Sequence, residues 1–186
     1  MPPSMALMER HLPQFQFEEH HSLVVKSSPA RLLDAAQVGA REPDPMIERF
    51  IAVREFPARV LSRLGRTNRL PPRPFGFEDF TLLGRHGDQE LAYGLAGRFW
   101  QSDYGLQHLA SASDFDQVKK LPKLVLNFAV ETIAGDQCRL STTTRVWCPD
   151  AASQRRFAPY WYLIRPVSGL IRKRLLHRIA THAAEP

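Results

Sequence analysis

The stretch CRLSTTTRVWCPDAASQRRFAPYWYLIRP, residues 138–166, decides the fold because an alternating segment in it runs directly into a helical one. Residues 138–148 alternate and are rich in threonine, which favours a β-strand. Asp150 follows Pro149 and is a good residue to cap a helix. Beyond it, apolar side chains recur at three- and four-residue steps, with a break around residues 166–169: Phe157, Trp161, Ile164, Ile171, Leu175 and Ile179. The stretch therefore predicts a strand followed at once by a long C-terminal helix.

A second long strand precedes this one and turns back into it at Gly135 and Asp136. Glycine at the first position of a two-residue loop is typical of a type II′ turn, so the sequence predicts a β-hairpin here. With this turn, Asn127 is expected opposite Thr144, on the same face as Glu131 and Thr142. The pattern therefore predicts a polar row on one face of the sheet.

The segments before this hairpin predict one strand and two short helices. Residues 15–25 alternate as a strand, and Ser28 followed by Pro29 is a typical start for a short helix. A second helix is expected after Asp44, and a proline-rich connector is expected over residues 66–79.

Residues 80–100 predict a second hairpin that turns at Gly87 and Asp88. Its second strand, expected over residues 90–100, has one unusually small face. That face consists of Ala92, Gly94 and Ala96, continued by Arg98 and Trp100. Residues 102–122 predict a loop with one short strand.

The order of these elements predicts a single α+β domain. One strand, two helices, a run of antiparallel strands and one long helix form one unit, and no change in composition indicates a second core. We expect a flexible leader over residues 1–14, the domain over residues 15–182 and a short tail over residues 183–186.

Composition narrows the class of protein. Hydrophobic residues make up 44% and charged residues 24% of the chain, and no apolar run approaches the roughly 18 residues of a membrane span. The first residues lack the apolar core of a secretory signal, so the expected location is the cytoplasm. Cys138 and Cys148 lie too far apart along one strand to form a disulfide. Because His20 and His21 point to opposite faces of a strand, and no cofactor motif is present, neither a metal nor a cofactor is expected.

The formal net charge of +6 is concentrated at the C-terminal end. Residues 150–186 hold seven lysines and arginines against Asp150 and Glu185. A basic helix of this kind suits a solvated surface, an anionic membrane or an acidic partner. It lacks the pattern of a known nucleic-acid reader, so no nucleic acid is expected.

Four segments, GLAGRFW at 94–100, LVLNFAVE at 124–131, LSTTTRVWCPD at 140–150 and RRFAPYWYLIRPVSGLIRKRLL at 155–176, resemble an uncharacterised bacterial branch of the START-like or Bet v 1-like (SRPBCC) superfamily. The resemblance implies the helix-grip fold, in which a curved antiparallel sheet wraps around the final helix and encloses a cavity. In this branch a glutamate is expected where the chain has Thr143.

The resemblance implies that the strand leading into the helix lines the cavity. Thr142 and Thr144 then offer hydroxyls to a ligand, although a threonine ladder is also common on an exposed sheet face. The arginines suit a ligand carboxylate or a surface ion pair, and the aromatic residues suit a ligand or plain core packing. The expected ligand-binding residues are Arg98, Trp100, Asn127, Thr142, Thr144, Tyr160, Trp161 and Arg165.

Three functions stay open at this stage. The first is binding of a small hydrophobic or amphipathic molecule in the cavity. The second is an enzyme of the polyketide cyclase or aromatase kind, for which the available acid or base groups are Glu19, His21, Glu131 and Tyr160. The third is a non-catalytic interaction module that docks through the basic helix or the proline-rich connector. Under any of the three functions, the protein is expected to be a monomer or a homodimer.

Overall fold

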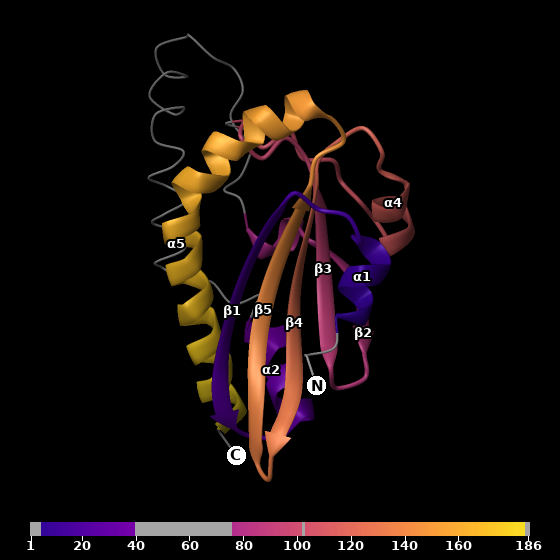
Figure 1. Ribbon diagram of the computed structural model, residues 1–186. Coiled ribbons are helices and arrows are strands. Elements are labelled where there is room, and N and C mark those ends of the chain that lie inside the picture. The colour runs from indigo at the N-terminus through magenta and orange to yellow at the C-terminus, as the bar shows by residue number, and fades with distance from the viewer. Residues whose placement is uncertain (1–4, 40–75, 102, 185–186) are drawn as a thin grey trace.

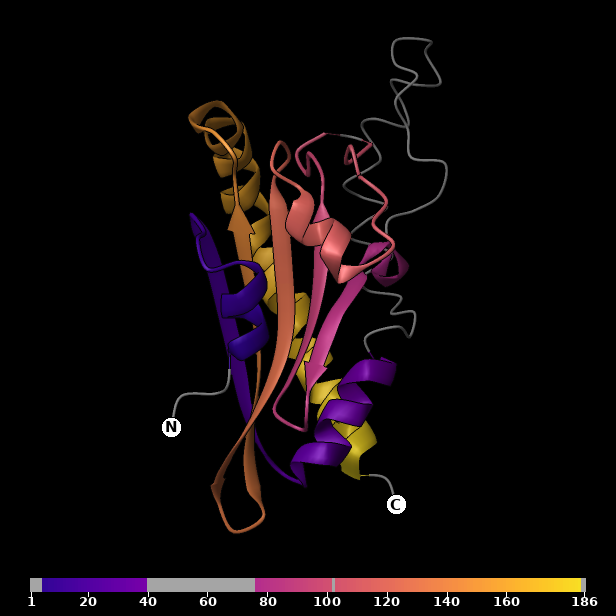
Figure 2. The same cartoon turned by 90° about the vertical axis from the view of Figure 1, so that its right-hand side faces the viewer.

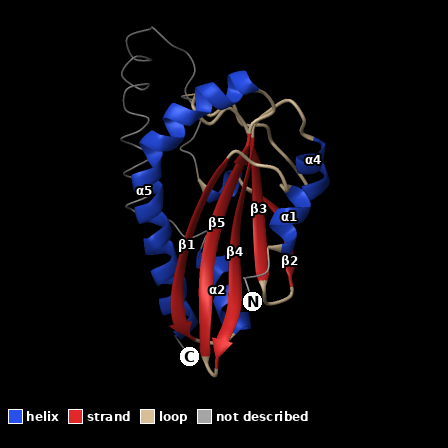
Figure 3. Cartoon of the chain, in the orientation of Figure 1, coloured by secondary structure: helices blue, strands red, loops and turns tan. Residues whose placement is uncertain are grey.

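The computed structural model describes residues 5–39, 76–101 and 103–184, which form a mixed α+β structure (Figures 1 and 3). A curved antiparallel sheet of five strands, in the order β1-β5-β4-β3-β2, packs against a long C-terminal helix. The strands are β1 (Phe17–Lys26), β2 (Thr81–His86), β3 (Glu90–Ala96), β4 (Lys123–Ala134) and β5 (Gln137–Trp147). The helices are α1 (Ala6–His11), α2 (Pro29–Gly39), the 3-10 turn η1 (Phe77–Asp79), α4 (Ala112–Gln117) and α5 (Ala151–Ala184).

The passage from β5 into α5 confirms the prediction from the opening stretch. The Asp150 carboxylate accepts a 2.7 Å hydrogen bond from the backbone N–H of Ser153. This bond holds the pKa of Asp150 below its usual value. The expected break around residue 166 does not end the helix. Instead α5 contains Pro159 and Pro166 and bends along its length, as Figure 1 shows.

Both predicted hairpins are present. β2 and β3 pair across Gly87, and β4 and β5 pair across Gly135, each glycine having the positive φ that such turns require. Cys138 and Cys148 are free, buried thiols, and burial raises the pKa of Cys148 to about 11. No helix in the described part of the chain is both long and apolar enough to cross a bilayer.

Three segments differ from the expectations. Residues 6–11, expected in a flexible leader, form α1, which buries Met8 completely. Residues 112–117 form α4 in a region where a loop and a short strand were predicted, and β3 ends at Ala96 rather than at residue 100. Ser111 accepts a hydrogen bond from the Asp114 N–H, and this Ser-x-x-Asp capping pattern was the sequence signal for α4. The helix expected after residue 44 and most of the proline-rich connector lie outside the described residues.

Helices cover both faces of the sheet. α2 and α5 pack on one face, and α1 and α4 pack on the other, as Figure 2 shows with α1 and α4 in front of the sheet and α5 behind it. On the α5-facing side the buried core includes Leu33, Tyr93, Phe128, Leu140 and Ile179. On the α1-facing side it includes Met8, Leu83, Ala92, Phe115 and Val125.

The small face of β3 is occupied by a helix side chain. A Cβ atom added to Gly94 would lie 2.7 Å from the Phe115 ring of α4 and 2.9 Å from Leu83. Ala92 and Ala96 belong to the same packed cluster as Phe115. The small residues therefore admit α4 to the sheet, and this face of β3 does not line a ligand cavity.

We predict that Gly94→Ala lowers the free energy of unfolding by about 1–3 kcal/mol, because the added methyl group overpacks the contact with Phe115. Urea denaturation measures the change. In a Phe115→Leu background, the same substitution should cost less, because the ring atoms that it meets are gone. An equal cost in both backgrounds would contradict the proposed contact.

Candidate functional site

The register of the β4–β5 hairpin decides which polar side chains share a face. A bulge between Thr132 and Ala134 shifts the pairing, so that Asn127 lies opposite Thr143 and not opposite Thr144. A one-residue shift exchanges the two faces of a strand. The predicted polar row is therefore wrong, because Asn127 lies on the α1-facing side while Thr142 and Thr144 lie on the α5-facing side.

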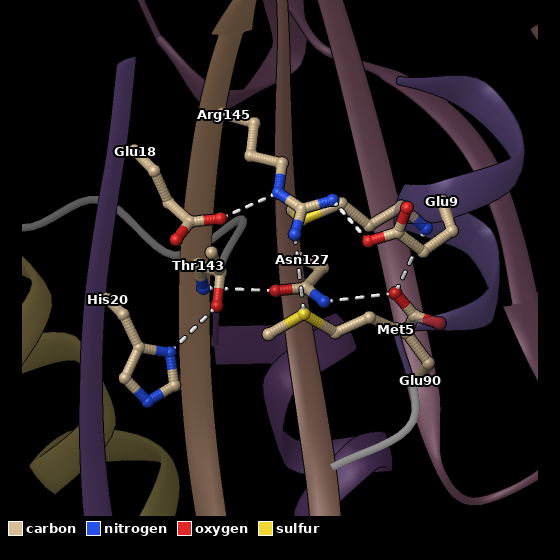
Figure 4. A network of polar contacts seen from close by, with 9 residues as sticks. Met5, Glu9, Glu18, His20, Glu90, Asn127, Thr143 and Arg145 are labelled. Atoms are coloured by element: carbon tan, nitrogen blue, oxygen red, sulfur yellow. Dashed lines mark hydrogen bonds and ion pairs between the residues drawn. The ribbon is translucent and has the colours of Figure 1, made fainter. Parts of the chain in front are cut away.

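A buried carboxylate organises the α1-facing side (Figure 4). Glu90, which is 0% exposed, accepts hydrogen bonds from the backbone N–H groups of Leu7 at 2.7 Å and Met8 at 3.2 Å. It also accepts a 2.9 Å hydrogen bond from the Asn127 amide. These N–H groups belong to the first turn of α1, where a negative charge is favourable. Asn127 is therefore part of a structural network, which corrects its prediction as a cavity residue.

From Glu90 on β3 the same network continues through β4 and β5 to β1. The Asn127 carbonyl oxygen accepts a hydrogen bond from the Thr143 N–H at 3.0 Å, and the Thr143 hydroxyl bonds His20 Nδ1 at 2.8 Å. Arg145 donates to Glu18 and to Glu9, each at 2.6 Å, and so connects β1 and β5 to α1. In Figure 4, Glu90 and the Arg145–Glu9 pair hold α1 on the sheet, and the other bonds join strands to one another.

We expect Glu90→Ala to lower the free energy of unfolding by about 3 kcal/mol, because it leaves two helix N–H groups and the Asn127 amide without an acceptor. Hydrogen exchange should show α1 opening first. Asp88→Ala, which removes an exposed carboxylate from the adjacent turn, should cost less than about 1 kcal/mol. If the two variants are equally stable, Glu90 does not hold α1.

A second polar group lies on the α5-facing side, and we call it the Glu19 cluster. Its members are Glu19, His21, Thr142, Thr144, Ser168 and Arg172. In the sheet, Glu19 pairs with Thr144 and His21 pairs with Thr142. Glu19 is only 5% exposed, and its Oε1 atom lies 2.9 Å from His21 Nε2. Within the described residues, Glu19 Oε2 and Thr144 Oγ1 are buried and have no hydrogen-bond partner.

Helix α5 contributes the other side of the Glu19 cluster. A Cβ atom on Gly169 would lie 3.2 Å from Glu19 Oε1 and 3.4 Å from the His21 ring, so glycine allows the helix to pass close to both. One turn on, the Arg172 guanidinium donates to Ser168 Oγ at 3.2 Å and approaches Thr142 Oγ1 at 3.5 Å. Burial lowers the pKa of Arg172 to about 10, while the negative charge of Glu19 acts in the opposite direction.

Aromatic side chains adjoin this cluster toward the start of α5. Phe17, two residues before Glu19 on β1, packs its ring 5.0 Å from that of Phe157 and 5.8 Å from that of Trp161. Trp100 and Tyr160 are partly buried against the same group. The α5-facing side therefore places a polar patch beside an aromatic one.

The eight predicted ligand residues thus divide between several places. Thr142 and Thr144 belong to the Glu19 cluster, and Trp100, Tyr160 and Trp161 belong to the aromatic group beside it. Arg98 and Arg165 are exposed, and Arg98 follows β3 rather than lying on it. Asn127 lies on the other face. Sequence reasoning missed Arg172, because a cation in a strongly basic helix gives no sign that its side chain turns inward.

Of the proposed acid or base groups, Glu19 and His21 lie in the Glu19 cluster. Glu131 pairs with Arg139 at 2.6 Å on the other face of the sheet. Among the described residues, no group of three or more His, Cys, Asp or Glu side chains is arranged to hold a metal ion. A hollow of about 420 Å³ lies at the turn end of the β4–β5 hairpin, lined by residues 26–29, Thr132, Gly135, Asp136 and Cys138, and includes no predicted ligand residue.

Comparisons with known proteins give little guidance. No family model matches the chain, and no curated protein matches it. Among solved structures, the chain is similar to TTHA0849 from Thermus thermophilus, with 9% sequence identity and a TM-score of 0.32 over 90% of this chain and 97% of that one. The geometry of the Glu19 cluster is therefore the main indication of a function.

The unpartnered Thr144 hydroxyl predicts an unusual result of mutation. Thr144→Val should leave the free energy of unfolding unchanged or raise it by up to about 1 kcal/mol, because it removes a buried hydroxyl that makes no hydrogen bond. Thr143→Val, one residue earlier, should lower it by about 1 kcal/mol, because that hydroxyl bonds His20. Chemical denaturation of ligand-free protein compares the two. An equal loss in both variants would show that Thr144 has a partner in the folded chain.

Proposed function

We propose that the protein binds a small hydrophobic or amphipathic molecule between the sheet and α5, in the manner of a helix-grip protein. One observation supports this most directly. Two adjacent buried oxygens, Glu19 Oε2 and Thr144 Oγ1, have no hydrogen-bond partner among the described residues. Buried polar groups are almost always paired in folded proteins, and leaving one unpaired costs roughly 1–3 kcal/mol. A bound molecule with a polar end would satisfy both.

The chemistry of the two oxygens defines the polar end of this molecule. An ionised carboxylate only accepts hydrogen bonds, whereas a threonine hydroxyl both donates and accepts. A ligand hydroxyl can therefore donate to Glu19 Oε2 and accept from Thr144 Oγ1 at once. An amine can donate to both. The proposed ligand accordingly carries a hydroxyl or an amine, and a ligand carboxylate is disfavoured beside Glu19.

The neighbouring groups suit the rest of such a molecule. Arg172 bonds Ser168 along the helix and reaches Thr142 on β5 at 3.5 Å, and so connects α5 to the sheet. His21 bonds Glu19 along β1. The rings of Phe17 and Trp161 provide an apolar surface next to it. Binding sites for small molecules commonly combine a mainly apolar wall with a few polar groups.

Native mass spectrometry of the purified protein, followed by denaturing extraction, tests the proposal. We expect an additional mass that corresponds to a molecule with a hydroxyl or amine group. Glu19→Gln together with Thr144→Val should reduce its occupancy by about tenfold or more, because each substitution removes one polar contact. The matched control is Glu18→Gln, which changes the next carboxylate along β1 on the opposite face, where it binds Arg145.

Titration with the neutral fluorophore N-phenyl-1-naphthylamine tests the same region when the protein purifies without a ligand. Saturable binding that Gly169→Leu abolishes would support a site between β1 and α5, because the added side chain points at Glu19 and His21. Absence of both a co-purified molecule and saturable fluorophore binding would contradict the proposed function. Equal loss in the Glu18→Gln control would place the site elsewhere.

A cyclase-like enzyme is the second candidate, and the 2.9 Å bond between Glu19 and His21 is the observation that favours it. A carboxylate bonded to an imidazole is a suitable pair for proton transfer. Identification of the compound extracted from the protein distinguishes binding from catalysis. A protein that only binds should yield the same compound from the parent chain and from His21→Phe. An enzyme should yield a product from the parent chain that is absent from His21→Phe.

A further inference from the structure

Helix α5 has a second face that the proposed ligand site does not use. We define its outer face by six exposed residues that follow one another at helical spacing on the side away from the sheet: Arg155, Arg156, Tyr162, Leu163, Leu170 and Lys173. The inward residues of the same helix, such as Phe157, Trp161, Gly169 and Leu176, are buried against the sheet. The two faces are therefore distinct in both composition and exposure.

The middle of the outer face is apolar and largely exposed to solvent. Tyr162 is 65% exposed, Leu163 is 78% exposed and Leu170 is 56% exposed. The other large exposed apolar side chains of the described chain are spread over other elements. From residue 162 to residue 170 the helix rises by about 12 Å, so these three side chains form one patch. Exposed apolar patches of this kind indicate an interaction surface.

Cations flank this patch on both sides. Arg155 and Arg156 lie about two turns before it, and Lys173 lies one turn after it. The whole of α5 contains seven lysines and arginines and no aspartate or glutamate. Asp150, which caps the helix, offsets part of the charge of Arg156, but no carboxylate lies within α5 itself, so the outer face suits a negatively charged partner.

The combination of leucines and cations identifies the kind of partner. We propose that the outer face of α5 docks on an anionic lipid surface, with Leu163 and Leu170 entering the headgroup layer and the flanking cations contacting lipid phosphates. Interfacial helices bind membranes by this pairing of apolar burial with electrostatic attraction. A nucleic acid would use the cations and could stack on Tyr162, but it would gain nothing from the exposed leucines, which make up the rest of the patch.

The shape of α5 supports the same orientation. The helix bends along its length, and its convex side faces away from the sheet (Figure 1). Pro159 and Pro166, two causes of helix bending, lie on either side of Leu163. A convex surface brings its middle to a flat membrane first, which is where the apolar side chains lie. The ligand site between the sheet and the inner face of α5 stays on the opposite side of the helix.

Cosedimentation with vesicles tests the proposal. We expect the full chain to bind vesicles of mixed phosphatidylglycerol and phosphatidylcholine, to bind phosphatidylcholine alone much more weakly, and to be released by salt. Arg155→Gln with Lys173→Gln should weaken binding by about tenfold or more. Leu163→Ser with Leu170→Ser should do the same, because the apolar anchors are lost. All four side chains are exposed, and thermal unfolding checks that the variants fold.

Two matched controls test whether vesicle binding depends on the outer face of α5 or only on the overall positive charge and on exposed apolar side chains in general. Lys119→Gln with Lys120→Gln removes the same net charge from an exposed loop after α4, and Val38→Ser removes an apolar side chain that is 61% exposed on α2. Both controls should bind vesicles as the parent protein does. Equal binding to neutral vesicles, an equal loss in the controls, or binding to a single-stranded oligonucleotide in place of vesicles would overturn the proposal. Fluorophore binding at the Glu19 cluster should be the same in all these variants, so the two proposals succeed or fail separately.

Discussion

The pairing of β5 with β4 on one side and β1 on the other is the constraint on which the structure depends. β5 lies inside the sheet, and every second side chain along it faces α5 while the others face α1. The bulge between Thr132 and Ala134 sets its register against β4. Because a shift of one residue would exchange the two faces, this bulge determines that Thr144 meets α5 and that Thr143 meets the α1-facing network.

The two faces hold buried carboxylates in opposite situations. Glu90 accepts three hydrogen bonds from groups that need an acceptor, and α1 is held on the sheet as a result. Glu19 is almost as deeply buried, yet one of its oxygens bonds His21 and the other has no partner within the described chain. A satisfied buried charge is typical of a structural role. An unsatisfied one beside an unpaired hydroxyl costs stability, which is why a bound molecule is the simplest explanation for Glu19.

The long helix serves both proposed activities because it is bent and has two different faces. Its inner face brings Gly169 and Arg172 to the Glu19 cluster, and the absence of a side chain on Gly169 allows that approach. Its outer face presents exposed leucines between cations. If both proposals hold, a lipid-like molecule with a hydroxyl or amine could reach the site from a membrane on the far side of the same helix.

Local patterns in the sequence were enough to predict both hairpins, α2, the Asp150 cap and the long α5, because turn glycines, caps and apolar spacing act over a few residues. They did not reveal α1, a six-residue helix whose first N–H groups depend on Glu90, more than eighty residues away. Nor did they place Asn127, since a bulge leaves no clear sign in the sequence, or show that Arg172 points inward. Most of the strands and the longer helices were thus determined by local sequence, but α1 was not. Which side chains meet was decided only by tertiary structure, because strand register and helix packing depend on contacts between segments far apart in the chain.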